Sequence, residues 1–439
     1  MKRLFVRASL VTTVVLWPLI SVLAQQSGIT AVERRAADVC AQFRATPGDY
    51  EKLFDPEFLA KVPPDRLTPI FTGYFKQLGP CVQTKLAKTQ DLNGAEFNFI
   101  FEKAFSVPVK LVVNGTGPNL ISGFIIGNPV STSSSLSDLV TELKTLPGDT
   151  SFLVARLNDN STVNVIAHNA ESELAIGSAF KLYILSELAR QTNSRERKLT
   201  DVVTLDGRLM SLPSGTLQTW PVGSPVTLHT LAAFMISISD NTAADQLLKA
   251  LGRERVEHIM AETGHAKPSL DAPFLTTLEM FKLKGEPTHK AADEYLALDL
   301  EGRRKFLDNQ IANLKREDAR PYPDGRPAYV DRIEWFASVS DLCRAMNWLR
   351  QQTEATKAAA PLREVLAINP GQGMNVSRER WSYIGFKGGS EPGVLNLTYL
   401  LRSTKGQWYA MSLTWNNRQE PVDISRVIPL VQRALQIIE

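Results

Sequence analysis

A serine and a lysine three residues apart stand in the apolar stretch AIGSAFKLYIL, which is predicted to begin a helix. At this spacing Ser178 and Lys181 share one helix face, so the lysine amine can approach the serine hydroxyl. Burial makes a lysine lose its proton readily, and a helix start favours a nearby oxyanion. The pair therefore predicts a serine nucleophile whose base is a lysine. The alternative is an ordinary buried helix start, because serine is a common helix cap.

Two later motifs carry polar groups of the kind that such a reaction needs. In the Ser-Asp-Asn motif, Ser239 can pass a proton to the departing group and Asn241 can bind a substrate amide; the alternative is a helix cap. Lys387 ends a predicted strand, and Gly388 and Gly389 after it let a ligand approach the strand backbone. Here the alternative is a solvated lysine beside a glycine-rich turn. Each motif alone is weak, but their order along the chain is specific.

In this order the three motifs resemble those of the class A β-lactamase family of penicillin-recognising serine enzymes, over about residues 136–439. The resemblance implies that Ser178 attacks an acyl carbonyl, with Lys181 as the base and Ser239 as the proton shuttle. The residues that it implies for substrate binding are Asn241, Lys387, Gly388, Gly389 and Ser390.

The same resemblance implies how the substrate is held. Lys387 would face a substrate carboxylate, and the backbone N–H groups of Ser178 and Ser390 would form an oxyanion hole. No cofactor is implied. No metal site is predicted either, because the five histidines form no His-x-x-x-His pattern. The expected partner is a small molecule, either a β-lactam or an ester.

Two departures from the family pattern bear on turnover. The family carries a Glu-x-x-Leu-Asn stretch whose glutamate positions the deacylating water, and residues 262–285 contain no such stretch. Glu279 is expected to be a surface charge at a helix start, and Glu262 is poorly placed. Gly388 stands where the family usually has Ser or Thr, a loss for which Ser390 can compensate.

The sequence leaves two functional hypotheses open. The first is an exported serine hydrolase that forms an acyl-enzyme on Ser178 with β-lactams or small esters and deacylates β-lactams slowly. The second is a protein that only binds its ligand or stays acylated, or a peptidase or esterase without lactamase activity. Oligomeric state is not predicted by any of these motifs.

The elements that must position the motifs form a predicted α+β domain over residues 138–439. Strands at 151–157 and 162–168 precede a long helical region, and further strands follow between residues 381 and 416. Strands at both ends of a helical region predict one antiparallel sheet, flanked by helices, whose first and last segments meet. A charged helical insertion is expected at about residues 283–332.

A separate small α+β domain is predicted at residues 29–129, followed by a serine-rich linker at 130–137. Residues 31–90 have apolar positions spaced as in helices, and the segments after them have the alternation and turn signals of an antiparallel meander. This two-domain order resembles a protein of the clavulanic acid gene cluster, whose front half is similar to steroid isomerases. By that resemblance the first domain has a cone-like fold of the nuclear-transport-factor type. Its strands offer no convincing acid/base pair, so a structural or ligand-shaping role is expected.

The N-terminal residues predict export. Lys2, Arg3 and Arg7 precede an apolar stretch, the pattern of a signal peptide over residues 1–24. An uncleaved membrane anchor is the alternative, although the apolar stretch is short for a span and contains Pro18. Cleavage would leave 46 basic and 46 acidic residues, which gives no support for nucleic acid or an anionic membrane as partner. The mature protein is therefore expected in the periplasm or the medium.

The three cysteines are too few for a disulfide scaffold, and no Cys/His cluster indicates zinc. In an oxidising compartment Cys40 and Cys81 can pair, because both fall in one predicted domain, whereas Cys343 would stay free. Two buried free thiols at 40 and 81 remain the alternative.

Overall fold

The structure, a computed structural model, divides into two compact units, Met1–Thr132 and Ser133–Glu439. The described residues are 23–91, 93–115, 117–158, 162–285, 288–371 and 377–438, with side chains from residue 31 onward. The predicted signal peptide therefore lies almost entirely outside the described residues. Within the described part of the chain, no helix is both long enough and apolar enough to cross a membrane.

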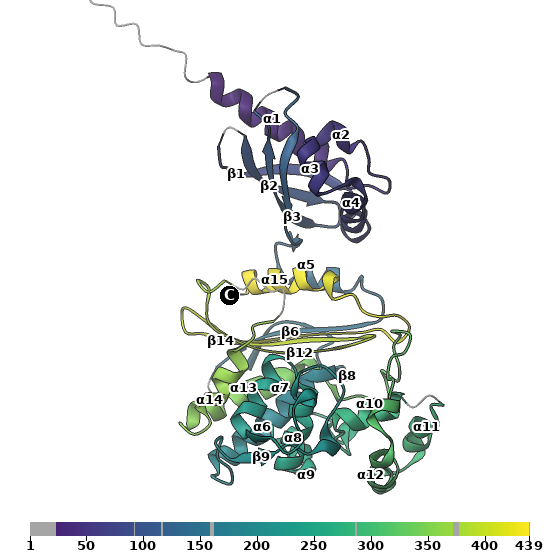
Figure 1. The fold of residues 1–439 in the computed structure, drawn as a ribbon. Coiled ribbons are helices and arrows are strands. Elements are labelled where there is room, and N and C mark those ends of the chain that lie inside the picture. Colours follow the sequence, from purple (N-terminus) through teal and green to yellow (C-terminus); the bar gives the residue numbers. More distant parts are fainter. Residues whose placement is uncertain are drawn as a thin grey trace, which may run out of the picture. The chain divides into compact units, whose positions relative to one another are not determined.

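The first unit combines two long and two short helices with an antiparallel sheet (Figure 1). Strands β1 to β4 pair in sequence order, and β5 pairs with β3. The helices are α1 (Leu23–Cys40), α2 (Tyr50–Leu53), α3 (Pro56–Lys61) and α4 (Pro64–Leu78). The strands are β1 (Cys81–Thr89), β2 (Gly94–Phe101), β3 (Phe105–Val113), β4 (Ile121–Ile126) and β5 (Val130–Ser131).

The core of this unit is aromatic. Phe97, Phe99 and Phe101 alternate along β2 and are all buried, as one face of a half-buried strand requires. Phe43 meets Phe99 and Phe101 edge to face, with ring centroids 6.1 and 5.0 Å apart. Among the described residues of this unit, the polar side chains that are buried are those of Gln42 and Ser131. Its described interior thus contains no buried acid or histidine.

The predicted helical region over residues 31–90 is wrong in its last part. Helix α4 ends at Leu78, and residues 81–89 form strand β1. Most positions of β1 are exposed, so the strand is held by its antiparallel pairing with β2 and not by a buried face of its own. Residues 130 and 131, placed in the linker by the sequence, also form a strand and pair with β3.

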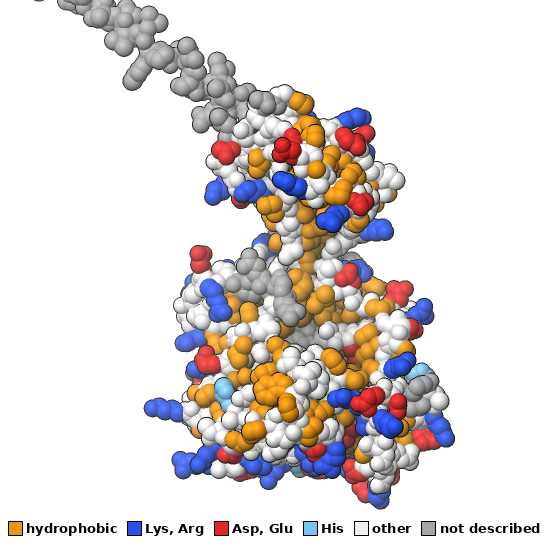
Figure 2. Space-filling model, in the orientation of Figure 1, with side chains coloured by type: hydrophobic (Ala, Val, Ile, Leu, Met, Phe, Trp, Pro, Cys, Tyr) orange, Lys and Arg blue, Asp and Glu red, His pale blue; other side chains and the backbone are white. Residues whose placement is uncertain are grey.

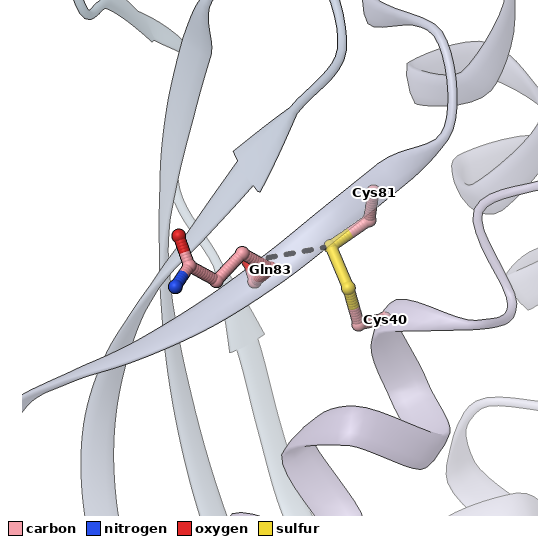
Figure 3. The surroundings of a disulfide bond; sticks show 3 residues. All are labelled: Cys40, Cys81 and Gln83. Carbon is pink, nitrogen blue, oxygen red and sulfur yellow. Dashed lines mark hydrogen bonds between the residues drawn. A yellow bond between two sulfur atoms is a disulfide. The ribbon is translucent and has the colours of Figure 1, made fainter.

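A disulfide joins the end of α1 to the start of the sheet (Figure 3). Cys40 and Cys81 are bonded, with their Cα atoms 5.4 Å apart, and Cys343 is a buried free thiol. The pairing that the sequence left open is thereby confirmed. Because the bond anchors β1 at its first residue, it stabilises the strand whose own sequence least favours burial.

The second unit is built on one antiparallel sheet in the order β12, β13, β14, β6, β7. The last segment of the sheet therefore pairs with the first, as predicted, through β14 and β6. Residues 159–161, which connect β6 and β7, lie outside the described residues. The strands are β6 (Asp149–Leu157), β7 (Thr162–His168), β12 (Trp381–Glu391), β13 (Val394–Ser403) and β14 (Trp408–Asn416).

Helices cover both faces of this sheet, which confirms the predicted α+β class. Figure 1 shows α5 and α15 on one face and α6, α7, α8 and α13 on the other. Coverage of both faces explains why β13 and β14 are buried at almost every position instead of alternating. The helices are α5 (Leu136–Leu143), α6 (Lys181–Asn193), α7 (Leu228–Ser237), α8 (Asn241–Leu251), α9 (Arg253–Glu262), α10 (Thr277–Gly285), α13 (Val339–Ala355), α14 (Ala360–Ala367) and α15 (Ile428–Ile437).

The segment predicted as a charged helical insertion, residues 283–332, is helical only up to residue 309, because the described residues after it form two short 3₁₀ turns and irregular chain. It contains α11 (Lys290–Ala297) and α12 (Leu300–Asn309). Figure 2 shows acidic and basic side chains gathered over this part of the surface. Only a few of its residues, such as Tyr322, line the main cavity of the unit.

The disulfide predicts a definite thiol count. Alkylation of the denatured protein without reductant should label one cysteine, Cys343, and alkylation after reduction should label three. The bond closes a sequence separation of 41 residues, so replacing Cys40 and Cys81 together by serine should lower the free energy of unfolding of the first unit by about 2–4 kcal/mol. Intact-mass analysis and urea unfolding measure the two effects. Three labelled thiols without reductant would contradict the pairing.

Candidate active site

The predicted nucleophile lies in a tight turn at the start of a buried helix. Ser178 belongs to the 3₁₀ turn Gly177–Phe180, which leads directly into α6. The turn follows β8 (Leu174–Ala175), whose Ala175 exchanges two backbone hydrogen bonds with the Asn416 side chain of β14. Strand β14 of the sheet therefore fixes the position of β8, the short strand that leads into the turn.

Two glycines allow the strand β12 to lie against this turn. A Cβ atom at Gly389 would lie 2.1 Å from the carbonyl oxygen of Ile176 and 2.5 Å from the Ser178 nitrogen, so only glycine fits. Gly177 has φ +48°, a left-handed conformation, and a Cβ there would lie 3.1 Å from the Ser390 nitrogen. The backbone amides of Ser178 and Ser390 are thus neighbours, as an oxyanion hole requires.

Lys181 is the centre of the hydrogen-bond network. Its amine is fully buried and lies 3.3 Å from the Ser178 hydroxyl, 3.2 Å from the Ser239 hydroxyl and 2.7 Å from both the Ser239 carbonyl and Asn241 Oδ1. Burial lowers the pKa of Lys181 to about 7, against the opposing effect of the Asp245 and Asp240 charges. A substantial neutral fraction of this amine near pH 7 can accept the Ser178 proton.

Ser239 is held in an unusual backbone conformation between two elements. Its φ is +56°, and its carbonyl accepts hydrogen bonds from Lys181 and from the Ser214 hydroxyl at 2.6 Å. Asp240 caps α8 through the Ala243 amide and also accepts from the Thr216 amide. The helix cap that was the alternative interpretation of the Ser-Asp-Asn motif is therefore present, and it orients Ser239 towards Lys181.

Lys387 is a second buried amine in the same site. It donates to the Ser239 hydroxyl at 3.0 Å and to the Gly388 carbonyl at 2.5 Å, and 2 % of its surface is exposed. The alternative of a solvated lysine is therefore wrong. Burial, and then the charge of Lys181, hold the pKa of Lys387 well below its usual value. The Ser239 hydroxyl thus lies between two amines and can exchange protons with either.

These groups open onto one cavity of about 650 Å³. All eight predicted site residues except Lys181 line it, and Lys181 reaches it through the two serine hydroxyls. Apolar side chains, among them Phe180, Trp335 and Ile236, form much of the remaining wall. The structure thus brings together, in one cavity, residues as far apart along the chain as Ser178 and Ser390, which are separated by 212 positions.

The two glutamates weighed as substitutes for the missing family residue do not line the cavity. Glu279 caps α10 through the Thr276 amide at 2.8 Å and pairs with Arg253 at 2.6 Å, so its predicted role as a surface charge is wrong. Its side chain is only 16 % exposed. Glu262 is exposed at the end of α9.

One acidic residue that the sequence analysis missed does reach the cavity. Of the acids in the described parts of the chain, Glu391 alone lines it, together with Tyr322 from the insertion. Both carboxylate oxygens are occupied: Lys284 donates at 2.6 Å and the Tyr322 hydroxyl also donates. Burial opposes ionisation, but the Lys284 cation outweighs it and lowers the pKa of Glu391. In the sequence, the one feature that indicated a place for Glu391 near the site was its position directly after Ser390.

The comparisons with known proteins concern the second unit. Residues 132–307 match the model of the Beta-lactamase enzyme family, a range that includes Ser178, Lys181 and Ser239. The predicted relation to serine hydrolases of the β-lactamase type is thereby confirmed for this part of the chain. No curated protein sequence matches this chain.

Several solved structures are similar to about two thirds of the chain. A β-lactamase from Sphaerobacter thermophilus is 20 % identical, with a TM-score of 0.47 over 68 % of this chain and 96 % of that one. A β-lactamase from Chitinophaga pinensis is 14 % identical, with the same TM-score and coverage. A structure titled PBP-A is 16 % identical, with a TM-score of 0.46 over 69 % of this chain and 96 % of that one.

The Lys181 environment predicts how Ser178 reactivity depends on pH. The neutral amine is the form that can accept a proton, so labelling of Ser178 by a fluorophosphonate probe should speed up as pH rises through about 7 and level off above it. Below pH 6 the rate should fall about tenfold per pH unit. The measurement is the labelling rate between pH 5 and 9, with circular dichroism as the control for folding. Lys181→Met should remove the labelling, and a flat profile would contradict the role of this amine.

Proposed function

We propose that this protein is an exported serine hydrolase that forms an acyl-enzyme on Ser178 with β-lactams or small esters and deacylates β-lactams slowly. The observation that carries the proposal is the contact of one buried, readily neutral amine with both hydroxyls. Lys181 Nζ lies 3.3 Å from Ser178 Oγ and 3.2 Å from Ser239 Oγ. A base in reach of the nucleophile and of a proton shuttle is what acyl transfer needs.

Acylation would proceed in three proton transfers. Ser178 Oγ attacks the carbonyl carbon and gives its proton to Lys181, while the amides of Ser178 and Ser390 bind the oxyanion. On collapse of the tetrahedral intermediate the C–N or C–O bond breaks, and the Ser239 hydroxyl protonates the leaving atom. Ser239 regains its proton from Lys181, so the amine ends neutral and the serine ends acylated.

Lys387 would bind an anionic group of the substrate. A buried amine with neutral partners gains most from a carboxylate that enters the same desolvated space. The ligand would raise the pKa of Lys387, so substrate binding and proton uptake would be coupled.

We expect slow deacylation because the carboxylate of Glu391 already accepts hydrogen bonds from Lys284 and Tyr322. Hydrolysis of an acyl-enzyme needs a base for the attacking water, which is typically worth roughly 10²–10⁴-fold in rate. Glu391 is committed to Lys284 and Tyr322, and Glu262 and Glu279 do not line the cavity. The same observation favours the second candidate function, a protein that is acylated and stays so.

Export is proposed on two observations. The first 24 residues have the pattern of a signal peptide, and the first unit contains a disulfide, which persists in oxidising compartments. Together they favour the periplasm or the medium as the location of the mature protein.

A penicillin should be captured faster than it is released. Mass spectrometry of the protein mixed with a penicillin and sampled over minutes should find a persistent adduct on the Ser178 peptide. Ser178→Ala should give no adduct, and a p-nitrophenyl ester of a small acid should turn over more readily than the penicillin. Complete penicillin hydrolysis without an adduct would refute slow deacylation, and absence of both adduct and hydrolysis would refute acylation.

Lys387 should distinguish anionic from neutral substrates. Lys387→Met keeps most of the side-chain volume and removes the charge, so capture of a penicillin should fall at least tenfold more than capture of a neutral ester. The measurement is the second-order acylation rate for each substrate. Lys405→Met, a lysine of the exposed turn between β13 and β14, is the matched control and should change neither rate. An equal loss for both substrates would assign Lys387 to the support of Ser239 instead.

A further inference from the structure

A cluster of ionisable side chains outside the cavity has the composition of a metal site. Glu173 precedes β8, His265 follows α9, and Asp341 lies in the first turn of α13. One ligand atom from each lies within 4.8 Å of the others. None of the three lines the active-site cavity. Three separate segments of the chain therefore bring an imidazole and two carboxylates together.

The histidine is held in the tautomer that a metal ligand needs. His265 Nε2 is 2.8 Å from the Phe336 carbonyl oxygen, which can only accept, so Nε2 carries the proton. The lone pair is then on Nδ1, which lies 4.0 Å from Asp341 Oδ2. A backbone N–H of Lys267 reaches Nδ1 at 3.1 Å, a contact that a metal ion would replace. A neutral imidazole does not balance the negative charge of the carboxylates. The hydrogen bond to the Phe336 carbonyl fixes the orientation of the ring.

Several oxygens in the cluster have no hydrogen-bond partner. Both carboxylate oxygens of Glu173 are buried without one, and so is Oδ2 of Asp271. The Asp271 side chain is fully buried, and that oxygen lies 3.7 Å from His265 Nε2. The hydroxyl of Tyr183, whose ring lies 5.6 Å from that of His265, is also without a partner. An unpaired buried carboxylate is costly unless a cation or proton accompanies it.

The charge around the cluster is only partly balanced. Asp341 is well satisfied, because it accepts from the Ser338 and Ala266 amides and pairs with Arg344 at 2.5 Å. No comparable partner is present for Glu173 or for Asp271 Oδ2 in the described structure. The cations that act on Glu173 are Lys267 and Arg344, and Arg344 is already paired with Asp341 and, at 3.8 Å, with Glu171.

We infer that this cluster binds one divalent transition-metal ion, with Glu173, His265 and Asp341 as ligands and Asp271 beside them. One imidazole nitrogen with carboxylate oxygens suits Zn²⁺, whereas Ca²⁺ takes oxygen ligands alone. Tetrahedral bonds of about 2.1 Å place ligand atoms about 3.4 Å apart, so the three ligand atoms, now within 4.8 Å of one another, would draw together around the ion. The ion would join the segment ahead of the nucleophile turn to α13, and would stabilise the second unit.

The test is metal binding by the full-length protein without a polyhistidine tag, after chelator treatment and removal of the chelator. Isothermal titration with Zn²⁺ should give one saturable site, and Zn²⁺ should raise the melting temperature. Glu173→Gln keeps the shape of the side chain and loses no hydrogen bond, so it should fold. It should weaken Zn²⁺ binding at least tenfold without lowering the melting temperature of the metal-free protein.

Glu171→Gln is the matched control, because this carboxylate is 70 % exposed and lies outside the ligand set, and it should bind Zn²⁺ as the parent does. His265→Gln provides a second variant and should also lose the site. Absence of a saturable site, or unchanged binding in Glu173→Gln and His265→Gln, would overturn the inference. Binding of Ca²⁺ but not of Zn²⁺ would overturn the assignment of the imidazole.

Discussion

The active site depends on the burial of one amine. Lys181 has no ion-pair partner in the described structure, and its amine is surrounded by the two serine hydroxyls, a carbonyl and an amide oxygen. These neutral acceptors satisfy its hydrogens without holding it in the charged form, so burial can lower its pKa to about 7. A direct carboxylate contact would have had the opposite effect. The chemistry of the site follows from which acceptors surround this amine.

The packing around Lys181 sets the remaining geometry. Asn416 of β14 holds Ala175, just ahead of the nucleophile turn, and Asp240 holds the loop that reaches Ser239. Gly389 lets the backbone of β12 touch the same turn. Lys387 also donates to the Ser239 hydroxyl at 3.0 Å, and the charge of Lys181 adds to burial in lowering the pKa of Lys387.

Three acids in the second unit differ in the partners that their carboxylates have. Asp245 caps the start of α10 through the amides of Thr277 and Leu278, and burial raises its pKa to about 7. Glu391 lines the cavity, is paired with Lys284 and accepts a hydrogen bond from the Tyr322 hydroxyl, so both of its carboxylate oxygens are occupied. Glu173 has no such partner, and the metal ion inferred here would supply its missing positive charge.

The sequence by itself determined the α+β class, the meeting of the first and last segments of the sheet, and the identity of the motif residues. Hydrophobic periodicity is a local property, and motif order is a property of the linear chain. Both can therefore be recognised in a single sequence without knowledge of tertiary contacts. It failed at β1, because an exposed strand has no burial pattern and forms only by pairing with β2. It also placed Glu279 on the surface, because its partner Arg253 belongs to a different helix.

Only the tertiary structure decided the protonation of the amines, the occupation of Glu391 and the cluster around Glu173. Each depends on burial and on partners from distant segments: Lys284 lies 107 residues from Glu391, and Asp341 lies 75 residues from Ala266. Residue spacing in the sequence does not predict such contacts, because Glu173, His265 and Asp341 come from three separate segments of the chain. The sequence therefore identifies the serines and lysines of the motifs, whereas burial and tertiary contacts determine the pKa values of the two lysines.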